Sequence, residues 1–121
     1  RARVKQEEDE HMRLLARAHA LGAFWLLVFD ADNAARAVEC GAAQELLHVA
    51  MEGVEAHYND RDPPALQASR GVLTHLAVAA MWTIADHKAC KARVVREMHA
   101  DLETMLVDAK MELAMLKASM A

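Results

Sequence analysis

The amino-acid sequence predicts an all-α protein, an antiparallel up-down-up-down four-helix bundle that forms one domain over residues 1–121. Hydrophobic residues make up 55% of the chain but aromatic residues only 4%, and strands draw more on aromatic and β-branched residues than this chain does. Apolar residues recur at spacings of three and four, which places them on one face of a helix. The breaks between these patterns are short and evenly spaced, which is typical of antiparallel helices.

The first helix is expected over residues 2–30 and the second over 33–59. The segment Asp30 to Asn33 separates them, because aspartate and asparagine are good N-cap residues. The inward face of the first helix is a stripe at helical spacing: Val4, Glu8, His11, Leu15, Ala18, His19, Gly22, Leu26 and Phe29. The second helix presents Cys40, Ala43, Leu47, Met51, Val54 and Tyr58.

The third helix is expected over residues 64–87, since Pro63 and Pro64 break the chain and proline is well placed to open a helix. The fourth is expected over 90–119. The break between them is polar but contains no glycine or proline. The alternative fold is a hairpin of two very long helices, two copies of which would dimerise into a bundle. The apolar face of the fourth helix consists of Met98, Leu102, Met105, Ala109, Leu113, Leu116 and Met120.

Two segments, 21–29 and 71–85, are apolar nearly all round, which indicates burial on every side. Some of this surface, with Trp25 and Trp82, is a candidate for packing against another chain, as it would in a homodimer. The net charge of −4 provides no basic surface for nucleic acid. The longest apolar run, 21–29, is too short to span a bilayer, so no membrane association is expected.

Cys40 and Cys90 do not have metal-ligand spacing and suit free thiols in a reducing compartment. The charged run from Arg1 to Glu10 is unlike a secretory signal. Together these features favour a cytoplasmic location.

All four glycines fall inside the expected helices, where each costs about 1 kcal/mol relative to alanine. Folding the helices back at their turns brings Gly22 level with Gly41, and Gly53 level with Gly71. Ala43 and Ala80 extend the first of these layers. Small residues at one height either let helices approach closely or leave a space for a small apolar ligand.

The same construction places His19 and His99 at nearly one height, close to the first glycine layer. A neutral imidazole is a good ligand for iron, and histidines on facing helices commonly hold a porphyrin in a bundle. The sequence therefore predicts a haem or related metalloporphyrin bound axially by His19 or His99, with redox or group-transfer catalysis as a further possibility. Gly22, Gly41, Ala43 and Ala80 would leave the space, and Thr83 would orient the ring of His99.

Two other classes of function stay open. One is a structural or self-associating helical bundle without a ligand, whose glycines serve close helix contact. The other is a cavity-based catalyst that uses a buried histidine or glutamate as a general base. A di-iron site built from Glu8-x-x-His11 and Glu45-x-x-His48 is disfavoured, because the two strings differ in height by about ten residues.

Short stretches resemble known families. Asp32-Asn33-Ala34-Ala35 and Pro63-Pro64 are similar to the connections of b-type four-helix cytochromes, a resemblance that implies a haem held in the bundle. The methionine and histidine ligands of that family have no clear counterparts in this chain.

Glu10-His11 and His48-x-x-x-Glu52 resemble pieces of hemerythrin, and Ala18-His19-Ala20-Leu21-Gly22 resembles a phosphotransfer-domain histidine motif. The regular helix lengths and the high alanine content also resemble a designed, de novo four-helix bundle.

Overall fold

The computed structural model describes residues 2–120 and contains, within that range, five α-helices and no strands. They are α1 (Ala2–Leu27), α2 (Ala31–Glu39), α3 (Ala42–Tyr58), α4 (Pro64–Asp86) and α5 (Lys88–Met120). The predicted all-α class is confirmed.

The predicted break near Asp30 and the predicted helix start at Pro64 are confirmed, although α1 ends at Leu27 instead of residue 30 and α2 begins at Ala31 instead of residue 33. Asp30 caps α2, because its Oδ2 accepts a hydrogen bond from the backbone N–H of Asn33 at 3.0 Å. Pro64 opens α4, where a missing N–H costs nothing. The third break, which the sequence marks least clearly, consists of the single extended residue His87 between α4 and α5.

The prediction of one continuous helix over 33–59 was wrong. The helix ends at Glu39 and resumes at Ala42, with Gly41 between them at φ 84°. This left-handed conformation costs an L-residue roughly 1–2 kcal/mol, and glycine adopts it freely. The backbone N–H of Gly41 closes the turn by donating to the carbonyl of Val38 at 3.0 Å. Gly41 therefore lies in the connection between α2 and α3, and the prediction that it lies inside a helix was also wrong.

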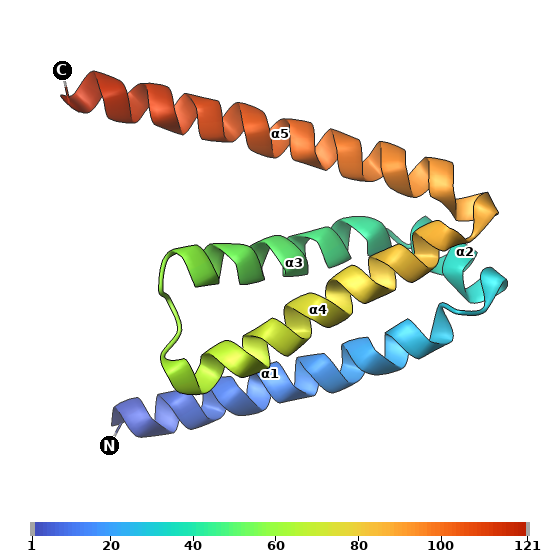
Figure 1. Cartoon of the computed structure of the whole chain (residues 1–121), viewed down its shortest axis with the longest axis horizontal. Helices are drawn as coiled ribbons and strands as arrows, with labels where there is room; N and C mark the ends of the chain where they lie inside the picture. Colours follow the sequence, from blue (N-terminus) through green and yellow to red (C-terminus); the bar gives the residue numbers. More distant parts are fainter. Residues whose placement is uncertain (1, 121) are drawn as a thin grey trace.

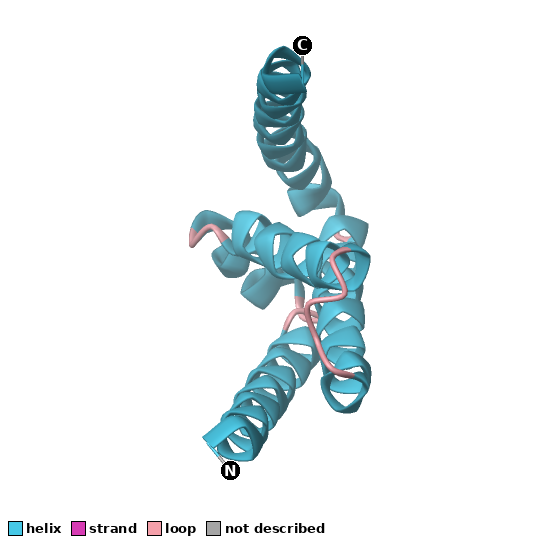
Figure 2. Ribbon diagram, turned by 90° about the vertical axis from the view of Figure 1, so that its left-hand side faces the viewer, coloured by secondary structure: helices cyan, strands magenta, loops and turns pink. Residues whose placement is uncertain are grey.

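The long helix α4 is the centre of the fold. It packs along α1 on one side and α3 on the other (Figure 1). Figure 2 shows that α3 and α4 lie between α1 and α5. The first and last helices of the chain are thus on opposite sides of the molecule, which differs from the closed packing expected of a four-helix up-down bundle.

The main core lies at the end of the molecule where α2 sits. Val28, Ile84 and Val94 are its largest fully buried side chains, and they come from the α1–α2 connection, α4 and α5. The ring of His87 fastens the α4–α5 connection to this end, since its Nε2 donates to the carbonyl oxygen of Val28 at 2.8 Å. A smaller cluster of Leu14, Leu66 and Leu73 joins α1 to α4.

Helix α5 leaves this body as it proceeds. Cys90 and Val94, near its start, are buried in the main core, and Met105 is half-buried. Every residue from 106 to 120 is exposed, and the ribbons of α5 and α3 diverge toward the C-terminus (Figure 1). Within residues 2–120, no helix has the combination of length and apolar character that a bilayer crossing needs.

Candidate functional site

The most deeply buried charge in the described part of the chain is Arg70 on α4, whose residue exposure is only 4%. Its guanidinium forms a bidentate pair with Asp62, which is 9% exposed: Nε donates to Oδ2, and Nη2 donates to Oδ1 at 3.2 Å. Asp62 lies in the connection between α3 and α4. The pair therefore fixes that connection to the helix it precedes.

Two further carboxylates reach the same guanidinium. Glu52 of α3 lies 3.3 Å from Nη1, and Glu10 of α1 lies 3.4 Å from Nη2. The hydrogen bonds with Asp62 raise the pKa of Arg70 above its usual value, against the opposing effect of burial. One cation thus holds α1, α3 and the α3–α4 connection against α4.

Arginines of α1 partly balance the excess of carboxylates. Arg17 lies 3.7 Å from Glu52, and Arg13 donates to Glu10 at 2.7 Å. Both arginines are far more exposed than Arg70. The cluster is therefore buried at Arg70 and Asp62 and open to solvent at its outer members.

A cleft of about 350 Å³ adjoins this cluster between α3 and α4. Gly53 and Gly71 line it together, at the second glycine layer that the sequence indicated. The two glycines act differently. A Cβ on Gly53 would lie 1.9 Å from Oγ1 of Thr74, whereas one on Gly71 would meet no atom within 4 Å. Gly53 allows the close approach of α3 to α4, and Gly71 keeps the cleft open.

The cleft has a mostly apolar wall and a polar rim. His57, Tyr58 and His75 lie on the rim, and all three are exposed. Its volume falls within the range of small-molecule pockets. Across residues 2–120, no group of three or more histidine, cysteine, aspartate or glutamate side chains is arranged to hold a metal ion.

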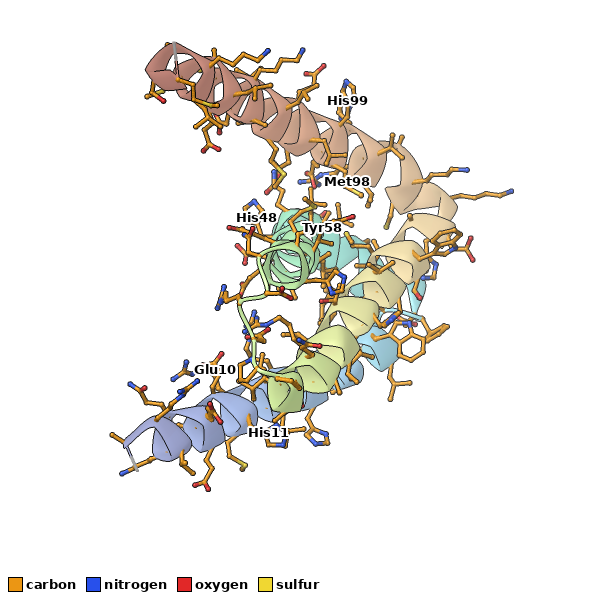
Figure 3. The ribbon with its side chains drawn as sticks, turned by 60° about the vertical axis from the view of Figure 1, so that its left-hand side comes forward. Glu10, His11, His48, Tyr58, Met98 and His99 are labelled. Atoms are coloured by element: carbon orange, nitrogen blue, oxygen red, sulfur yellow. The ribbon has the colours of Figure 1, made fainter. Side chains whose placement is uncertain are left out.

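The two histidines predicted to bind haem are on different sides of the molecule. His19 is exposed on α1, and the side chain of His99 on α5 is 71% exposed and paired with Glu103 at 3.1 Å. His99 projects from the outer side of α5, opposite to its neighbour Met98, which points toward α3 (Figure 3). The structure does not bring the two imidazoles to a common space.

The other residues of the predicted haem site have different surroundings. Ala43 and Ala80 are buried in the main core, and a Cβ on Gly22 would have no neighbour within 4 Å. Thr83 accepts a hydrogen bond from Nε1 of Trp25 at 2.9 Å and donates to the carbonyl of Ala79 at 2.8 Å. Thr83 therefore orients a tryptophan instead of His99.

Two further candidates from the sequence can be placed. Glu8, considered as a buried base, is exposed, and Cys40, expected to point inward, is exposed as well. Trp25 is half-buried and donates a hydrogen bond to Thr83. Trp82, on α4, is 74% exposed.

The Arg70 cluster was not predicted from the sequence. The available signal was an arginine at the start of the 71–85 segment, which is apolar nearly all round. A charge that begins such a segment is buried with it and needs a partner. The partners could not be read from spacing, because they come from three other segments of the chain.

A second surface of interest is the exposed part of α5. Leu113 is 51% exposed, Leu116 56% and Met120 79%. With Leu102, Met105 and Ala109, they follow one another at spacings of three and four residues and form one stripe along the helix, which we name the α5 seam. The seam begins where Met98 packs against the main core and continues to the last described turn.

Comparison of the chain with protein-family models, with curated proteins and with solved structures finds no match.

Replacing Arg70 tests the role of the buried cation. Arg70→Met leaves Asp62 buried without a counter-ion, and we expect the free energy of unfolding to fall by about 3–5 kcal/mol. Arg17→Met is the matched control, because it removes an arginine from the same Glu52 at a half-buried position near solvent, and its effect should stay within about 1 kcal/mol. Urea denaturation followed by circular dichroism measures both. Equal losses for the two variants would contradict a special role for Arg70.

Proposed function

We propose that the chain is an interaction protein that associates with a second copy of itself through the α5 seam. The observation that carries this proposal is that every residue from 106 to 120 is exposed while Leu113, Leu116 and Met120 lie with Ala109 on one face of the helix. Further exposed apolar side chains lie outside this face: Leu106, Val107, Met111 and Met115. Soluble proteins rarely expose a contiguous apolar stripe unless it is an interaction surface.

Helix physics supports the same proposal. An isolated helical segment of about 15 residues is marginally stable in water, because helices in proteins gain most of their stability from packing an apolar face. The segment 106–120 has the apolar face, but none of its residues is buried by the rest of the described chain, 2–120. Burying a leucine or methionine side chain contributes roughly 1.5–3 kcal/mol, so several seam residues together can stabilise both the segment and an assembly.

A second copy is the simplest partner, since most soluble oligomers are symmetric homo-oligomers. Two α5 helices in contact along their seams would cover each other, and each would supply the packing that the other lacks. The helical bundle predicted from the sequence would then be completed between two chains instead of within one.

The opposite face of α5 provides a matched control. It contains Val107 and Met111, which are 55% and 60% exposed, and Met115, which is 71% exposed, lies one turn after Met111. Leu113→Glu with Leu116→Glu should convert the protein to a monomer, because both charges would be buried in the interface. Val107→Glu with Met111→Glu changes a similar exposed area and should leave the dimer intact. Light scattering after size-exclusion chromatography measures the mass. A monomeric wild type, or a dimer that only the Val107 and Met111 variant dissociates, would overturn the proposal.

Haem binding stays a separate prediction of the sequence. His19 and His99 lie on opposite sides of the molecule, so only one of them can ligate a given haem. The prediction is a Soret shift when haemin is added to the wild type, which a His19→Ala, His99→Ala variant loses. No Soret shift in the wild type, or one that the double variant keeps, would contradict it.

A further inference from the structure

The distribution of charge along α5 indicates how two copies are oriented. At roughly 100° per residue, the seam residues from Leu102 to Met120 lie within about 40° of the direction of Ala109. Asp108 and Glu112 lie along one edge of this stripe, and Lys110 and Lys117 lie along the other. The exposed half of α5 thus has an apolar face between one acidic edge and one basic edge.

These four charges have no ion-pair partner within residues 2–120, although several pairs of oppositely charged side chains form elsewhere on the described surface. All four are exposed. Their separation by sign onto two edges is not required for the stability of the chain itself, since mixed signs at spacings of three or four along one edge would stabilise an isolated helix better.

The two possible orientations of paired helices use these edges differently. When two identical helices are parallel and related by a two-fold axis along them, the acidic edge of each faces the basic edge of the other. When they are antiparallel, each edge faces its own copy, so acidic residues oppose acidic residues and lysines oppose lysines. Opposite charges that face each other across an interface favour one register and orientation, and like charges that face each other disfavour the orientation that brings them together.

We propose that two copies of the chain bind with their α5 helices parallel, seam to seam, with the acidic edge of each beside the basic edge of the other. Lys110 then lies about 3 Å in height from both Asp108 and Glu112 of the second copy, at a rise of 1.5 Å per residue. The inference rests on the proposed self-association and adds its direction.

The seam spacing fits such a pair. Leu102 and Leu113, Met105 and Leu116, and Ala109 and Met120 are each eleven residues apart. An eleven-residue repeat corresponds to about 3.67 residues per turn, close to that of a straight helix, so the two seams can stay in contact without strong supercoiling. The small side chain of Ala109 at the middle lets the helices approach closely.

Single cysteines distinguish the orientations. The background variant Cys40→Ser, Cys90→Ala removes both native thiols, and Leu102→Cys or Leu116→Cys is added to it. In a parallel pair each residue faces its own copy, so each variant alone should form a disulfide-linked dimer under mild oxidation, within the Cα separation that a disulfide allows. In an antiparallel pair centred at Ala109, neither alone would cross-link, and a mixture of the two would.

The outcomes separate this inference from the proposed function. Cross-linking only in the mixture retains self-association through the seam and overturns the parallel orientation. A dimer in which Val107→Cys cross-links and neither seam cysteine does overturns both the seam and its orientation. If light scattering shows that both the wild type and the background variant are monomers, self-association itself is overturned.

Salt gives an independent readout on the unmodified protein. If oppositely charged edges face each other, raising the ionic strength screens an attraction and the dissociation constant of the dimer should rise several-fold. Like-charged edges repel, so in an antiparallel dimer the same change should tighten association. A dissociation constant that falls with added salt therefore contradicts the parallel pair.

Discussion

The buried guanidinium of Arg70 is the constraint on which the body of the molecule depends. A charge removed from water must be matched by hydrogen-bonding partners of opposite sign, and Arg70 finds them in α1, α3 and the connection before α4. This requirement fixes the crossing of three helices at one point. Gly53 allows the crossing to be close, because α3 approaches Thr74 of α4 where a Cβ would not fit.

Helix α5 is outside this arrangement. It is anchored to the main core by Cys90 and Val94 and by the hydrogen bond from His87 to Val28, but every residue of its second half, 106–120, is exposed among the residues that the structure describes. The chain thus combines a body held by a buried ion cluster with a helix whose apolar seam is free. The body positions α5, and in the proposed dimer the seam and its charged edges contact the second copy.

The sequence predicted the elements better than their assembly. The cap at Asp30 and the start at Pro64 follow from local chemistry, so they could be read from a few residues. Gly41 was misplaced because its neighbours favour helix and its left-handed φ has no sequence signal beyond glycine itself. That break invalidates the heights used to align His19 with His99, which assumed one continuous second helix. Gly53 and Gly71 do line one cleft, since the turn between their helices was correctly located. The Arg70 cluster could not be predicted, because its members meet only in the folded chain.

Hydrogen exchange measured at two protein concentrations tests most directly the claim that the second half of α5 is ordered by another copy. Above the dissociation constant, the amides of residues 106–120 should be protected; in dilute protein they should exchange at nearly the rate of an unfolded segment, because an unpacked helix of this length is marginal in water. The amides of α4 around Arg70 should stay protected at both concentrations. Protection of 106–120 that does not change on dilution from dimer to monomer would contradict this account.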